Sequence, residues 1–151
     1  MHPNASRIQI SESDANLALA HAPTDGKSLS VRLDGDRFLL IADGLPLVGQ
    51  VHIELLAHPL TPDGRLRVDW KIRKPFGAFA FSGPISDLLR QKIATIPALA
   101  SAVVEVTKDH ILLDPARLRF GALTLGDHAQ ILSLTLAPPS GAAVELTFRL
   151  K

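Results

Sequence analysis

Most of this chain alternates apolar and polar residues with a period of two, the pattern of β-strands whose two faces meet different surroundings. The clearest run is 65–73, where Leu66, Val68, Trp70 and Ile72 alternate with charged residues. A strand with one apolar face and one charged face belongs to an antiparallel sheet that is buried on one side only. This alternation constrains the fold more than any other feature of the sequence.

The same alternation predicts further strands, separated by turn residues. Asp34-Gly35 predicts a type I′ hairpin turn, and Pro62-Asp63-Gly64 predicts a second turn in which glycine takes the positive-φ position. The further strands are expected at 8–10, 29–33, 37–42, 47–58, 102–107, 110–114, 118–125, 130–137 and 144–150.

The period changes to that of a helix at Ser82-Gly83-Pro84. Apolar residues then recur at spacings of three and four, which predicts an amphipathic helix over 84–101, broken or kinked at Pro97. Its apolar face is formed by Ile85, Leu88, Leu89, Ile93 and Ile96, and its polar face by Asp87, Arg90, Gln91 and Lys92. A shorter helix is expected at 12–21, where Ser11 and Asp14 resemble a capping box.

These elements predict one α+β domain over residues 1–151, with residues 1–6 flexible. A single strong helix has to cover about seven or eight strands, so the antiparallel sheet is expected to curve and wrap around the helix at 84–101. A flattened β-barrel with the helix as a lid is the alternative.

Composition excludes several classes of protein. The formal net charge is +1, there is no cysteine, and the aromatic residues are six Phe, one Trp and no Tyr. The near-neutral charge and the few aromatic residues give no electrostatic or stacking basis for nucleic-acid binding. The absence of cysteine excludes disulfides and thiolate metal sites. No apolar run has the length of a signal peptide core or a membrane span.

The titratable residues form no recognisable catalytic motif. His52, Glu54 and Asp69 could meet across neighbouring strands, but a solvated polar face accounts for them. A ligand cluster of His110 with Asp109 and Asp114 is the nearest approach to a metal site, and ordinary surface residues at a strand start account for it as well. We therefore expect no enzyme, no cofactor and no metal. A hydrolase or metal-dependent enzyme that uses His52 or His110 remains the third alternative.

An uncharged segment that contains Phe76, Phe79 and Phe81 follows a basic stretch that ends in Arg73 and Lys74. An apolar loop flanked by cations suits contact with an anionic membrane surface or the mouth of an apolar ligand site. The alternative is that the phenylalanines are core residues and the cations form a wet strand face.

The order of elements and a few soft motifs resemble single-domain bacterial proteins of the tubular lipid-binding (TULIP, BPI-like) superfamily. The residues that carry the resemblance are the acidic helix start Ile10–Leu17, the turn Pro62–Leu66 and the run Gly83–Leu89. The resemblance implies a sheet wrapped around the helix, and a groove that holds lipid tails without catalysis. It also implies that this groove is lined by Val51, Ile53, Val68, Trp70, Ile85, Leu88, Leu89 and Ile93. It further implies the extracytoplasmic cell envelope, with the signal or anchor missing from this chain; otherwise the protein is expected in the cytoplasm.

Two functional hypotheses follow. The first is a non-catalytic domain that binds a lipid or another apolar ligand at or between membranes. The alternative is a structural or interaction module with a filled core, which forms a homodimer through a sheet edge or through the Phe76–Phe81 loop. Alternation alone does not separate them, because a hollow core and a filled core need the same pattern.

Overall fold

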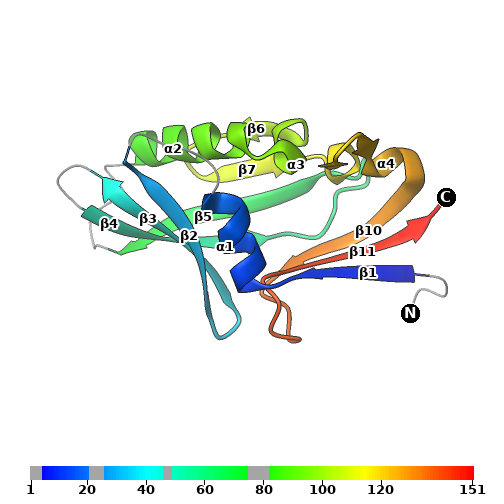
Figure 1. Cartoon of the computed structure of the whole chain (residues 1–151), viewed down its shortest axis with the longest axis horizontal. Helices are drawn as coiled ribbons and strands as arrows, with labels where there is room; N and C mark the ends of the chain where they lie inside the picture. Colours follow the sequence, from blue (N-terminus) through cyan, green and yellow to red (C-terminus); the bar gives the residue numbers. More distant parts are fainter. Residues whose placement is uncertain (1–4, 21–25, 46–48, 75–81) are drawn as a thin grey trace.

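The computed structural model describes residues 5–20, 26–45, 49–74 and 82–151. The strands of this part of the chain form three antiparallel sheets, with helices packed beside them in an α+β fold (Figure 1). The strands are β1 (Ala5–Ile10), β2 (Ser28–Asp34), β3 (Arg37–Leu45), β4 (Gly49–Ala57), β5 (Leu66–Lys74), β6 (Val103–Val106), β7 (His110–Leu113), β8 (Arg119–Phe120), β9 (Leu123–Thr124), β10 (Ala129–Leu136) and β11 (Val144–Leu150). The helices are α1 (Glu12–Ala20), α2 (Ser82–Thr95), α3 (Pro97–Ala100), a 3₁₀ turn η2 (Pro115–Arg117) and α4 (Leu125–His128).

The largest sheet, here called the main sheet, has the strand order β2-β3-β4-β5-β7-β6 and carries α2 on one face (Figure 1). The predicted apolar face of α2 packs on this sheet. Ile85 is fully buried, and it shares one apolar core with Ile53 and Leu66 of the sheet. The period-two and period-3.6 patterns therefore meet where an amphipathic helix and a one-sided sheet must bury their apolar faces.

The predicted break at Pro97 is present. Helix α2 runs from Ser82 to Thr95, Ile96 is extended, and α3 begins at Pro97, so the helix predicted over 84–101 is two helices. The prediction for one side chain is wrong. Lys92, predicted on the polar face, is buried instead, and its Nζ donates to the carbonyl oxygen of Leu19 at 3.2 Å. Loss of solvation lowers the pKa of Lys92.

The second sheet, here called the terminal sheet, has the order β1-β11-β10 and joins the two ends of the chain (Figure 1). β1 pairs with β11 from Ala5↔Arg149 to Ile10↔Val144. β1 thus begins inside the stretch that was expected to be flexible, and residues 1–4 lie outside the described part of the chain.

Two local predictions are wrong. The strand expected at 118–125 is instead the short hairpin β8–β9 followed by α4, because Leu118 and Leu125 are both buried and turn the chain back on itself. The turn between β2 and β3 is centred on Gly35 and Asp36, since Asp34 pairs with Arg37. Only Gly35 has a positive φ there, which excludes the predicted type I′ turn.

Helix α1 protects the free edge of β2, which is one edge of the main sheet. The Asn16 side chain donates from Nδ2 to the carbonyl oxygen of Val31 at 3.0 Å, and its Oδ1 accepts from the Val31 N–H. One helical turn earlier, Glu12 Oε1 accepts from the N–H of Leu33 at 3.0 Å. Two side chains therefore replace the neighbouring strand that the edge of β2 lacks. The expected cap is also present, because Ser11 Oγ accepts from the Asp14 N–H.

Removing the Asn16 side chain tests this edge protection. Asn16→Ala leaves the N–H and C=O of Val31 without partners, and we expect a loss of about 2 kcal/mol in the free energy of unfolding, measured with urea. Leu17→Ala is the matched control, because Leu17 is 61% exposed on the same helix. An unchanged stability of Asn16→Ala would show that the edge does not depend on this amide.

Gly44 packs closely against the backbone of Gly26. Its φ is +80°, and a Cβ there would collide with the backbone of Gly26. Gly64 has a similar φ of +82° but open space around it. We expect Gly64→Ala to cost about 1–2 kcal/mol through backbone strain alone, and Gly44→Ala to cost distinctly more, measured by thermal unfolding. Equal losses would mean that the contact with Gly26 relaxes freely.

Candidate functional site

The main and terminal sheets face each other along an unpaired seam, defined here as the gap between residues 56–60 and β10. β3 pairs with β4 only as far as Phe38↔Leu55, so the chain beyond Leu55 extends past the end of β3. On its other side this stretch stays paired with β5, through Ala57↔Val68 and the His58 N–H to Arg67. One edge of 56–60 is therefore unpaired, and it lies near β10, the edge strand of the terminal sheet.

Two local features account for the failure of these edges to join. Pro59 has no N–H to donate, and proline interrupts strand pairing. β10 carries a register irregularity between Ile131 and Ser133, which places Leu132 in a bulge opposite β11. A bulge bends a strand and ends regular pairing. Both residues border the seam.

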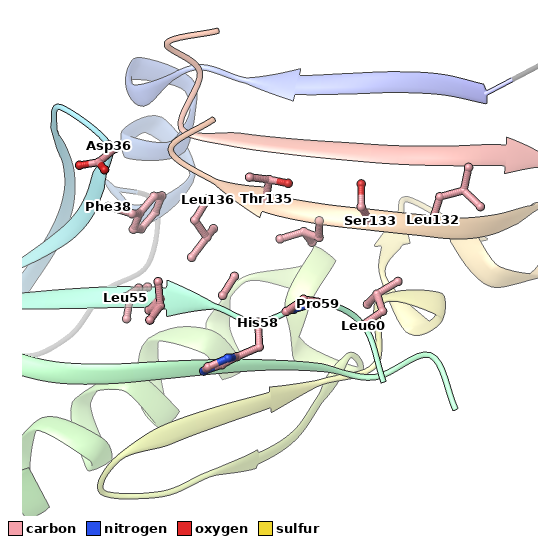
Figure 2. A pocket seen from close by; sticks show the side chains of 13 residues that line it. Asp36, Phe38, Leu55, His58, Pro59, Leu60, Leu132, Ser133, Thr135 and Leu136 are labelled. Carbon is pink, nitrogen blue, oxygen red and sulfur yellow. The ribbon is translucent and has the colours of Figure 1, made fainter. Parts of the chain in front are cut away.

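A cavity of about 350 Å³ occupies the seam (Figure 2). Leu136 points from β10 into the gap, whereas Ser133 points to the other side of the strand (Figure 2). The apolar residues that line the cavity are Phe38, Leu55, Leu56, Ala57, Pro59, Leu60, Leu132, Leu134 and Leu136, and the polar ones are Asp36, His58, Ser133 and Thr135. This volume and lining are within the range of small-molecule sites.

His58, which lines the cavity, belongs to a polar cluster with Arg67 and Asp69 of β5. His58 Nε2 lies 2.6 Å from Asp69 Oδ2, and Arg67 Nε donates to Asp69 Oδ1 at 2.8 Å. The hydrogen bond from Arg67, followed by that with His58, lowers the pKa of Asp69. This arrangement keeps the carboxylate ionised and orients the His58 ring at the edge of the cavity.

A second charged cluster lies beside the seam on the outer face of the main sheet. Glu54 Oε2 is 3.3 Å from Arg73 and 3.5 Å from Lys71, and Oε1 is 3.7 Å from Arg37. The Glu54 side chain is only 16% exposed, and Arg37 approaches it from β3 while Lys71 and Arg73 approach it from β5. One carboxylate therefore holds three cations together.

The structure places the predicted groove residues in the interior. Val51, Ile53, Val68, Trp70, Ile85, Leu88 and Leu89 are buried together between α2 and the main sheet, and Ile93 packs partly buried against them. Trp70 also donates from Nε1 to the carbonyl oxygen of Thr107 at 3.0 Å. None of these residues lines the seam cavity. Their role in binding a ligand stays a prediction.

The predicted contact segment is only partly described. Arg73 and Lys74 end β5 and are exposed, and Arg73 contacts Glu54. Phe76, Phe79 and Phe81 lie outside the described residues.

The structure separates the candidate catalytic and metal residues. His52 contacts Gln50 at 3.0 Å, Glu54 is held by cations and Asp69 by His58, so the three do not form one site. His110 Nδ1 is 2.7 Å from Asp109 Oδ1, while Asp114 instead caps η2 through the Ala116 N–H. Within the described ranges, no three His, Asp or Glu side chains are placed to hold a metal ion.

The described helices include none with the length and hydropathy of a membrane-spanning segment. Comparison with protein-family models, curated proteins and solved structures gives no significant match to this chain.

Sequence reasoning did not find the seam, although two of its signals are present in the chain. Pro59 directly follows the strand predicted at 47–58. The turn at Gly35 makes β3 begin at Arg37, so β4 extends beyond the first residue of β3. These signals mark where pairing stops, but they do not indicate that β10 lies opposite. That neighbour comes only from the tertiary fold.

The cluster at Asp69 predicts a pH dependence. The pKa of Asp69 is below its ordinary value of 3.8 in the folded protein, so its stabilisation is present above pH 3.8 and is lost as the pH falls through the lower, folded-state pKa. Because this carboxylate is more than a third exposed, the effect should be under about 1 kcal/mol.

Urea unfolding at pH 6 and at pH 3 measures this difference. We expect Asp69→Asn to lose less stability between the two pH values than the unmodified protein. Asp127→Asn, which alters an exposed carboxylate on α4, serves as the control. An identical pH dependence in all three proteins would contradict the role given to Asp69.

Proposed function

We propose that this protein is a non-catalytic domain that binds a lipid or another apolar ligand, with the seam cavity as its entry or binding site. The observation that carries the proposal is an apolar cavity at a place where two strand edges face each other without pairing. In a continuous sheet, backbone hydrogen bonds would join these two strand edges. An apolar molecule can fill the gap instead, because it needs no hydrogen-bond partners.

The arrangement of α2 supports the same proposal. An antiparallel sheet covers the apolar face of one main helix (Figure 1). The resemblance to tubular lipid-binding proteins implies a sheet wrapped around such a helix. In this proposal the sheets wrap around α2, and the seam is the lateral opening through which an acyl chain reaches Leu134 and Leu136.

A second candidate is the self-associating module with a filled core. The burial of seven predicted groove residues between α2 and the main sheet favours it. Helix α1 covers the β2 edge, so the main-sheet edge that self-association would use is β6. Light scattering after gel filtration separates the candidates, since a mass that rises with protein concentration favours the module and a monomer that co-purifies with lipid favours the binding domain.

Filling the cavity tests the first proposal directly. Ala57 lines the seam, and Ala57→Phe should occupy its volume while the paired edge to β5 is kept. We expect the dissociation constant for the neutral apolar dye Nile red, followed by its fluorescence, to rise roughly tenfold or more, equivalent to about 1.4 kcal/mol.

Ala18→Phe is the matched control, because it adds the same ring to the exposed side of α1. It should leave dye binding unchanged. Thermal unfolding of both variants checks that they remain folded. If the dye binds equally to the unmodified protein and to Ala57→Phe, the seam is not the binding site.

A further inference from the structure

An excess of positive charge adjoins the seam on the outer face of the main sheet. Arg37, Lys71 and Arg73 surround the single carboxylate of Glu54. Lys74 ends the same strand as Lys71 and makes no ion pair within the described residues. Arg32 on β2 likewise makes no ion pair there, and it shares a row of the sheet with Glu54, through Arg32↔Leu39 and Leu39↔Glu54.

This cluster lies at the mouth of the cavity. Arg37 is between Asp36 and Phe38 in the chain, and both of those residues line the cavity. Leu56, another lining residue, is 61% exposed and lies two positions along β4 from Glu54, on the same face. Residues two apart on one strand are separated by about 6.6–6.8 Å, so the cations begin where the apolar lining ends.

The acidic groups around the mouth do not cancel this charge. Asp69 is already held by Arg67 and His58, and Glu54 is shared by three cations. Asp34 and Asp36 flank the turn before Arg37, and neither is within ion-pair distance of a described cation. The cationic side chains near the mouth therefore outnumber the carboxylates. Asp34 and Asp36 are matched by Arg32 and Lys74, and the one carboxylate of Glu54 is shared by three cations.

We propose that this basic cluster binds the anionic headgroup of an amphiphile whose apolar chain enters the seam cavity. The proposal rests on the function proposed above and narrows its ligand to amphiphiles with a carboxylate or phosphate headgroup. Buried Leu39 lies between Arg32 and Glu54 in the same row of the sheet. An apolar neighbour reduces the screening by water and so strengthens the attraction of the cations for an anion.

The test compares a charged and a neutral ligand with the same chain. Palmitate and monopalmitoylglycerol are titrated against bound Nile red at 50 mM and 500 mM NaCl. We expect palmitate to displace the dye at roughly tenfold lower concentration at low salt, and this preference to shrink at high salt. Equal displacement by the two ligands would overturn the headgroup site but leave the proposed function intact. Failure of Nile red to bind at all would overturn both.

Two double variants test whether the preference for palmitate depends on this basic cluster. Arg32→Gln/Arg37→Gln removes two cations while Glu54 keeps Lys71 and Arg73, so the fold should be retained. It should abolish the preference for palmitate and leave monopalmitoylglycerol unaffected. Arg7→Gln/Lys108→Gln removes the same charge from exposed positions elsewhere and should keep the preference.

A membrane surface is the competing occupant of the cluster. Vesicles of phosphatidylcholine with phosphatidylglycerol distinguish it in a sedimentation assay. If Ala57→Phe, with its cavity filled, sediments with these vesicles as the unmodified protein does, and Arg32→Gln/Arg37→Gln does not, the cluster binds a lipid surface and the headgroup proposal is overturned. Loss of dye binding in Ala57→Phe, together with no Arg32- and Arg37-dependent sedimentation, supports it.

Discussion

The packing of α2 on the main sheet is the interaction on which the rest of the structure depends. Ile85, Leu88 and Leu89 cover the inner faces of the strands, and the burial of each such side chain contributes about 1.5–3 kcal/mol. One helix has limited length, however, and it covers the main sheet but not the terminal sheet (Figure 1). The seam lies between the two sheets, where residues 56–60 and β10 do not pair.

The strand edges of this protein are kept from pairing with other strands in different ways. The β2 edge is covered by α1, whose Asn16 and Glu12 bind the backbone of Val31 and Leu33. The edges at the seam are kept apart by Pro59 and by the irregularity in β10. A protein that only had to avoid edge-to-edge association could have paired these two edges with each other. Their separation leaves the apolar cavity of the seam between the two sheets.

Much of the local structure follows from the sequence pattern. Alternation located β2, β5, β10 and β11 to within a few residues, and the spacing of three and four located α2. It was wrong over 118–125, because the apolar residues there face two sides of a tight hairpin rather than one face of a strand. It also placed Lys92 in solvent, since helical periodicity does not show that the end of α1 packs over that position.

The sequence by itself determined which segments are strands or helices, which faces are apolar, and that the core is aliphatic. Only the tertiary structure decided that β1 pairs with β11, that β10 faces residues 56–60, and that Glu54 gathers three cations. The physical reason is that alternation identifies a face but not a neighbour. Backbone hydrogen bonds between strands are nearly independent of side-chain identity, so the partner and register of each strand are set by the packing of the whole chain.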